Sequence, residues 1–181
     1  PHTIRILSVT TWEELDQLMR QYAIQVCVVD ALPEERDAKA FQLRWNTPGM
    51  LRIWRAVYRE PSTASSSRDL QWRDKKELDL PNLNPVVSIP RDEILSPSAN
   101  GLLPARVLPR FDGSPAYDAY ITHHENSKRV PVWEEGLEKE RVKARDEWVA
   151  TGADHFFHAA TYEMVARLAP TRQASAMPSP D

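Results

Sequence analysis

Cysteine and glycine are scarce in this sequence, and both shortages exclude classes of site. Its 181 residues include a single cysteine, Cys27, and five glycines. One cysteine cannot form an intrachain disulfide, and its place in an apolar run predicts a buried thiol rather than a nucleophile. The sequence contains no GxxxxGK[ST] segment to cradle a phosphate and no GxSxG segment to carry a serine nucleophile. A phosphate-binding loop and a serine-hydrolase site of these types are therefore excluded.

Excess charge and long apolar stretches are also lacking. The net charge is −3, which gives no overall attraction to nucleic acid, so a DNA partner would need a local basic patch. No apolar run approaches the roughly 20 residues of a membrane-spanning helix, and the N-terminus lacks the pattern of a signal peptide. The composition predicts a soluble protein of the reducing cytoplasm, without a membrane partner.

The first third of the chain alternates between strand and helix patterns. Thr11 followed by Glu14 forms a capping box before a helical apolar stripe, and residues 25–30 are apolar on both faces, as in a central parallel strand covered by helices. This order indicates an α/β unit with right-handed crossovers. The expected elements are a strand at 4–9, a helix at 11–23, a strand at 25–30, a helix whose first turn is Pro33–Glu35 with Ala38, Phe41 and Trp45 inward, a turn at 46–49, and a strand within 50–58 with Leu51, Ile53 and Val57 in the core.

The remainder is less regular, and its elements are spaced by charged and proline-rich segments. One folded domain is expected over residues 1–169, with a disordered tail at 170–181 that has no core residues to bury. The expected elements are a solvated hairpin or loop at 73–79, a strand at 86–89, a short helix opening at 90–93, a surface segment at 96–115, a helix at 133–149 with Leu137, Val142 and Trp148 inward that stops at Gly152, and a helix at 154–169 with Phe157, Met164, Val165 and Leu168 inward.

Asp30 is the first candidate site residue. It ends an apolar strand, and in open α/β sheets ligands gather outside the carboxyl ends of the strands. Capping of the next helix is the alternative, but Pro33 places that cap nearer to Leu32. The position therefore favours a site role for Asp30.

A second candidate group opens the final helix. Asp154 and His158 are one turn apart on the same face, and His155 follows Asp154 directly. An aspartate at a helix start can equally well cap free backbone donors, so the DHFFH segment alone is a weak metal motif. For the segment His123, His124 and Glu125, a polar surface turn is the favoured interpretation over ligands.

Two ordered blocks resemble the C-terminal nuclease domain of phage terminase large subunits. The first is WEELDQLMRQYAIQVCVVDALPEERDAKAFQLRW, similar to the helix, acidic strand and helix of that family. The second is EWVATGADHFFHAATYEMVARL, similar to the closing motif in which an aspartate and a histidine open a helix. Between them, VVSIPRDEIL is similar to the family's strand and arginine–acid segment. The resemblance covers roughly residues 4–168.

The resemblance implies a ribonuclease H-like fold, with a mixed central sheet and flanking helices, that cuts concatemeric double-stranded DNA. Its chemistry would use two Mg²⁺ or Mn²⁺ ions held by three acids. Asp30 matches the second family acid and Asp154 the third, with His155, His158 and Glu34 as possible supporting residues. The first acid belongs to an earlier strand, and the sequence has no acid before Glu13.

This missing acid predicts a domain truncated at its N-terminus, with weak or absent nuclease activity in this chain alone. The chain would be a fragment of a longer polypeptide or a degenerate prophage remnant, or an acid of the next helix would partly substitute for the missing one. Those acids, Glu34, Glu35 and Asp37, are also explained by the positive end of the helix dipole.

The implied partners are double-stranded DNA, the terminase ATPase domain, the portal and the small terminase subunit, in the cytoplasm of the host cell. The sequence carries no ATPase motif of its own. Basic residues of the later half could contact the phosphate backbone, although a solvated face is the commoner explanation for scattered basic residues. They are Arg106, Arg110, Lys128 and Arg129, together with Lys143 and Arg145.

The sequence is also compatible with two other functions. The chain could be a noncatalytic interaction module of the packaging motor, in which Asp30 and Asp154 serve only as strand-end and helix-cap residues. It could instead be a different metallohydrolase, with a site built from His123, His124, Asp154 and His158.

Overall fold

The chain divides into two compact units. The computed structural model describes residues 5–59, 70–73, 83–90, 108–135 and 141–170. The sheet unit comprises Val9–Arg91 and Tyr162–Asp181, and the hairpin unit comprises Pro1–Ser8 and Asp92–Thr161. The last helix, α5 (His155–Arg167), contributes residues to both units.

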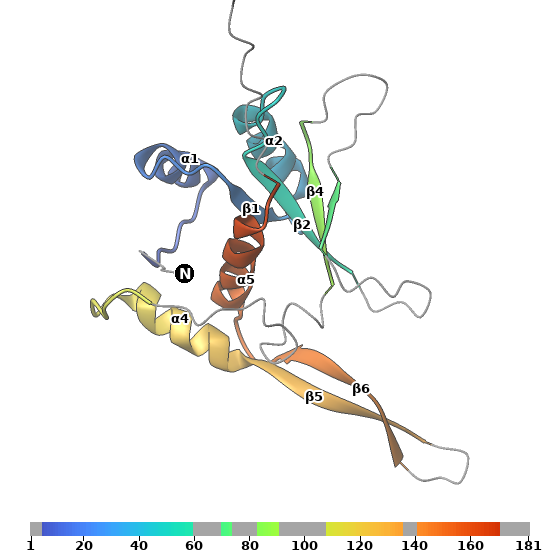
Figure 1. Ribbon diagram of the computed structural model, residues 1–181. Helices are drawn as coiled ribbons and strands as arrows, with labels where there is room; N and C mark the ends of the chain where they lie inside the picture. Colours follow the sequence, from blue (N-terminus) through green and yellow to red (C-terminus); the bar gives the residue numbers. More distant parts are fainter. Residues whose placement is uncertain (1–4, 60–69, 74–82, 91–107, 136–140, 171–181) are drawn as a thin grey trace, which may run out of the picture. The chain divides into compact units, whose positions relative to one another are not determined.

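The sheet unit contains a four-stranded mixed sheet, which confirms the expected α/β class (Figure 1). The strands β1 (Cys27–Asp30), β2 (Ile53–Arg59) and β4 (Val86–Pro90) are parallel, and β3 (Gln71–Arg73) runs antiparallel to β4. Their order across the sheet is β1-β2-β4-β3. The carboxyl ends of the three parallel strands therefore share one edge of the sheet.

Two expectations about these strands are wrong. The strand expected at 4–9 is absent from its described part, because residues 5–10 have no strand conformation despite their branched apolar side chains. The strand at 25–30 is shorter than expected and borders the described sheet rather than lying at its centre. An apolar run on both faces indicates how the faces are covered and does not specify how many neighbours the strand has.

Helix α1 (Trp12–Gln21) is the element that the sequence predicts best. The Thr11 hydroxyl accepts a hydrogen bond of 3.2 Å from the backbone N–H of Glu14, and the Glu14 carboxylate accepts one of 3.2 Å from the Thr11 N–H. This capping box satisfies donors that the first helical turn leaves free. Met19 is buried on the inner face of the helix, where it packs with Phe41 and Ile53.

Helix α2 (Glu35–Trp45) begins two residues later than the sequence predicts, after Pro33 and Glu34. Ala38 and Phe41 are buried on its inner face, as expected. The turn expected at 46–49 is present, because Thr47 and Met50 form a bridge that reverses the chain before β2.

Buried amides fix α2 to the sheet, a feature that apolar periodicity does not reveal. The Gln42 side chain donates to the carbonyls of Ile53 (3.1 Å) and Pro85 (2.7 Å). The Asn46 side chain donates to the carbonyls of Ile53 (3.0 Å) and Leu83 (2.9 Å), and its oxygen accepts from two backbone N–H groups of residues 52–53. These bonds satisfy buried backbone groups where α2, β2 and the start of β4 meet.

The two faces of β2 carry different contacts. Ile53 and Arg55 face α2, where the Arg55 Nε donates to Gln42 over 2.7 Å. On the other face, the Trp54 ring packs edge-on against Trp72 of β3 at 4.8 Å, and the Tyr58 ring lies 6.0 Å from that of Tyr162 in α5. Helices therefore cover both faces of this strand. Val57, expected in the core, is 37% exposed, so that expectation is wrong.

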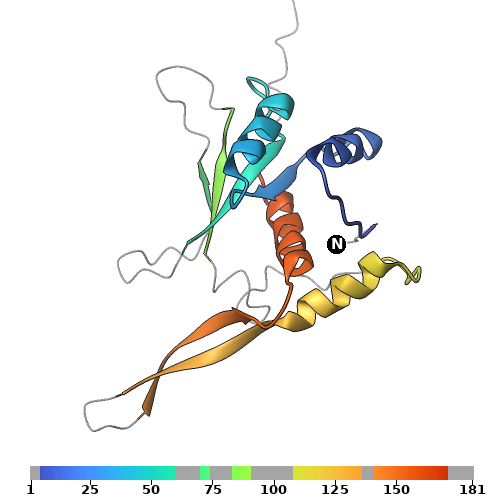
Figure 2. The ribbon, with the colours of Figure 1, turned by 180° about the vertical axis from the view of Figure 1, so that it is seen from behind.

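The hairpin unit contains α4 (Pro115–Asn126), which leads directly into β5 (Ser127–Glu135), as Figure 2 shows in yellow and orange. Ser114 caps α4 by accepting a bond of 3.3 Å from the Tyr117 N–H. This helix contains the histidine segment for which a surface turn was favoured, so that interpretation is wrong. Its low amphipathicity explains why periodicity does not reveal it.

The strand β5 pairs antiparallel with β6 (Arg141–Ala150), so the helix expected at 133–149 is wrong. The Glu, Lys and Arg of this segment favour a helix locally, but pairing with the valine- and proline-containing β5 sets the conformation. Trp148, expected as a helical anchor, lies opposite Arg129 across the two strands. Gly152 lies in a bend after β6 rather than at a helix end.

The final helix, expected at 154–169, is present as α5. Val165 is fully buried as expected, whereas Leu168 is 48% exposed and does not belong to the core. Several expected features lie outside the described residues: most of the hairpin or loop at 73–79, residues 91–93 of the short helix, residues 96–107, the inward Leu137 and the tail from residue 171 onward. Among the described helices, none is long and apolar enough to cross a membrane.

Candidate functional site

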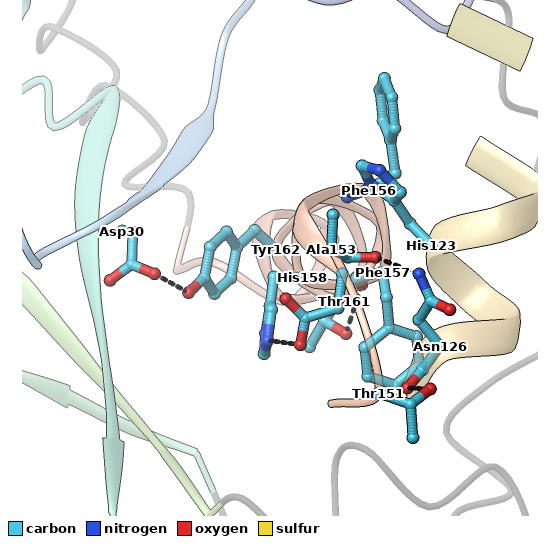
Figure 3. Close-up of polar contacts among 11 residues, drawn as sticks. Asp30, His123, Asn126, Thr151, Ala153, Phe156, Phe157, His158, Thr161 and Tyr162 are labelled. Atoms are coloured by element: carbon cyan, nitrogen blue, oxygen red, sulfur yellow. Dashed lines mark hydrogen bonds and ion pairs between the residues drawn. The ribbon is translucent and has the colours of Figure 1, made fainter. Parts of the chain in front are cut away.

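Asp30 is an exposed carboxylate at the carboxyl end of β1, and both of its oxygens accept hydrogen bonds. Oδ1 accepts a bond of 3.0 Å from the backbone N–H of Leu32, and Oδ2 accepts one of 2.7 Å from the hydroxyl of Tyr162 (Figure 3). No local partner for Asp30 was evident in the sequence, but in the structure its side chain accepts two hydrogen bonds. A carboxylate offers about four lone-pair positions, so two remain for a further ligand.

Tyr162 is the side chain that sequence reasoning missed. It is 7% exposed, on the part of α5 that belongs to the sheet unit, and its hydroxyl is directed at Asp30 (Figure 3). Burial, followed by Tyr58 and Asp30, raises the pKa of Tyr162 well above its usual value. The hydroxyl therefore stays protonated at neutral pH and acts as the donor to Asp30. The available signal was a tyrosine within the otherwise apolar stripe of the last helix.

Asp154 precedes the first turn of α5, and its side chain pairs with His158. The Oδ2 atom lies 3.1 Å from His158 Nε2, four residues later on the helix. Because a carboxylate only accepts, the His158 Nε2 carries the proton of this bond. The expected common face of Asp154 and His158 is thus confirmed. The backbone carbonyl of Asp154 accepts the first helical bonds, from Phe157 and His158.

His123 of α4 supplies a cap for α5, a role that the sequence left open for Asp154. Its Nδ1 accepts a bond of 3.2 Å from the backbone N–H of Phe156, one of the donors that a helix start leaves free. Nδ1 must therefore be unprotonated, which places the proton of neutral His123 on Nε2. His155 is exposed, and its ring meets that of His123 edge-on at 5.7 Å.

The last residue of α4 holds the segment that leads into α5. The Asn126 side chain donates to the carbonyl of Ala153 over 2.8 Å, and its backbone carbonyl accepts from the N–H and hydroxyl of Thr151 (Figure 3). Gly152 lies so close that an added Cβ would be 2.7 Å from the Asn126 Nδ2. This close approach explains the glycine better than the helix stop that the sequence suggested.

The acids around the start of α2 have structural partners. Glu34 accepts a bond of 3.1 Å from the indole N–H of Trp12. Glu35 pairs with Lys39 at 2.8 Å and with Arg55 at 3.3 Å. Lys39 chiefly, with a smaller contribution from Arg55, lowers the pKa of Glu35. Glu34 and Glu35 therefore connect secondary-structure elements. Each thus has a structural role, whether or not it also substitutes for the first acid of the expected metal site.

Some of the basic residues expected to contact DNA lie in the part of the chain that the structure describes. Arg110 is exposed before α4, and Lys128 and Arg129 are exposed at the start of β5. Arg106 lies outside the described residues. Consecutive strand residues point to opposite faces, so Lys128 and Arg129 do not form one basic face by themselves.

Among the described residues, no group of three or more His, Cys, Asp or Glu side chains could hold a metal ion. His123 and His158 instead make the two bonds described above, and His124 Nδ1 donates to the carbonyl of Tyr120 over 2.7 Å.

Comparison of the chain with protein-family models, with curated proteins and with solved structures finds no match.

Proposed function

We propose that this chain is part of a ribonuclease H-like, metal-dependent endonuclease domain of a phage DNA-packaging terminase. Asp30 and Asp154 are the carboxylates that it supplies toward Mg²⁺ or Mn²⁺. We propose this family because of the ordered motifs around these two residues. The roles proposed for the two residues rest on the chemistry of their side chains. Two divalent ions in such a site would activate a water molecule and neutralise the leaving oxygen of the phosphodiester.

The observation that carries the proposal is that the Asp30 carboxylate is exposed and accepts hydrogen bonds from uncharged donors. Its side chain is exposed at the carboxyl end of a parallel strand, where ligands of open α/β sheets bind. Its two described partners, the Leu32 N–H and the Tyr162 hydroxyl, are both uncharged. The carboxylate is thus oriented without being neutralised, as a hard cation requires of an oxygen ligand.

Asp154 has a related arrangement in the hairpin unit. It is half-buried, and His158 orients one of its oxygens. Because His123 binds the Phe156 N–H, the Asp154 carboxylate is not needed for that cap. Histidine–carboxylate pairs of this kind orient ligands around metal ions in many proteins. Exposed Arg110, Lys128 and Arg129 are proposed as separate contacts to the DNA backbone, which would be independent of sequence and sensitive to salt.

A titration with Mn²⁺, followed by the electron paramagnetic resonance signal of the free ion, tests the proposal. We expect weak binding that is lost in Asp30→Asn and in Asp154→Asn and retained in Asp118→Asn, a matched change of an exposed acid on α4. Binding that survives both of the first two substitutions would overturn the assignment. Zinc affinity that depends on His123 and His158 would favour the alternative metallohydrolase.

One observation favours a second function, a noncatalytic interaction module of the packaging motor. Each of the two carboxylates already has an intrachain partner, Tyr162 for Asp30 and His158 for Asp154. If these bonds are the whole role of the carboxylates, Asp30→Asn and Asp154→Asn lower stability while the protein binds no Mn²⁺ in any form. The same titration, combined with urea unfolding, separates the two functions.

A further inference from the structure

We draw no further inference here: the strongest candidate, the outer edge of β6 in the hairpin unit, has no neighbouring strand among the described residues, and nothing in that part of the structure shows what would pair with it.

Discussion

The hydroxyl of Tyr162 donates a 2.7 Å hydrogen bond to Asp30, which connects α5 to the end of β1 within the sheet unit. Tyr162→Phe should lower the free energy of unfolding by about 1 kcal/mol, because water can replace the donor at the exposed carboxylate. Urea unfolding of the variant beside Tyr117→Phe checks this value. A loss above roughly 3 kcal/mol would show that the hydroxyl supports the core rather than the carboxylate.

His123→Ala should remove the cap that α4 provides for α5. The Phe156 N–H would lose its partner at 3.2 Å, and loss of a helix cap costs about 1 kcal/mol. Faster amide exchange at Phe156 is the specific sign of this change. His155→Ala is the matched control, because His155 is an exposed histidine next to the same helix start. Equal protection of Phe156 in wild type and His123→Ala would contradict this role.

Asn46→Ala should destabilise the sheet unit more than any other single polar change proposed here. Its side chain serves four backbone groups around β2, and leaving buried groups unsatisfied costs about 3 kcal/mol in total. Thermal or urea unfolding measures the loss, with the exposed Gln17→Ala as control. A change below roughly 0.5 kcal/mol would show that water or a rearranged loop serves these groups instead.

Cys27 should be inert toward thiol reagents in the folded protein. Burial raises the pKa of Cys27 to about 12, above its ordinary value of 9.0, so the thiolate that reacts is absent at neutral pH. Mixing with a disulfide reagent such as 5,5′-dithiobis(2-nitrobenzoic acid) should give slow reaction in buffer and fast reaction in denaturant. Fast reaction of the native protein would contradict the raised pKa of this thiol.

The same raised pKa gives a pH dependence with a definite sign. Between pH 9 and about 12 the unfolded chain loses the Cys27 proton while the folded chain keeps it. The stability contribution is therefore complete below pH 9 and declines as the pH rises toward 12. Relative to Cys27→Ala, wild type should lose up to roughly 1.4 kcal/mol per pH unit in this window. Parallel pH profiles of the two proteins would contradict the shift.

Local signals explain which parts of the fold can be predicted from the sequence. The capping box of Thr11 and Glu14 and the apolar run that ends at Asp30 are both contained in short segments, and both elements are present. The β5–β6 hairpin was mistaken for a helix because its conformation depends on pairing between segments rather than on periodicity. Branched residues at 5–9 suggested a strand, but they have no ladder partner in the described residues.

In the candidate site, too, the residues that could be predicted are those with a local signal in the sequence. Asp30 and Asp154 can be chosen from their places at a strand end and a helix start. The residues that orient or support these segments cannot be chosen from the sequence, because their partners are distant along the chain. Tyr162 is 132 positions from Asp30, His123 is 33 from Phe156, and Asn126 is 27 from Ala153. Such pairs are specified by tertiary packing, so a sequence pattern shows at most a tyrosine or histidine on a helix.

The most direct test of the proposed nuclease site is paramagnetic broadening by Mn²⁺ in a ¹⁵N-labelled protein. Substoichiometric Mn²⁺ broadens amide resonances steeply with decreasing distance from the ion. The proposal predicts selective loss of the signals of Ala31 and His155, which follow Asp30 and Asp154, and recovery of each signal when the aspartate before it is changed to asparagine. Uniform broadening, or broadening confined to other acidic segments, would contradict the assignment of these two carboxylates to a metal-dependent nuclease.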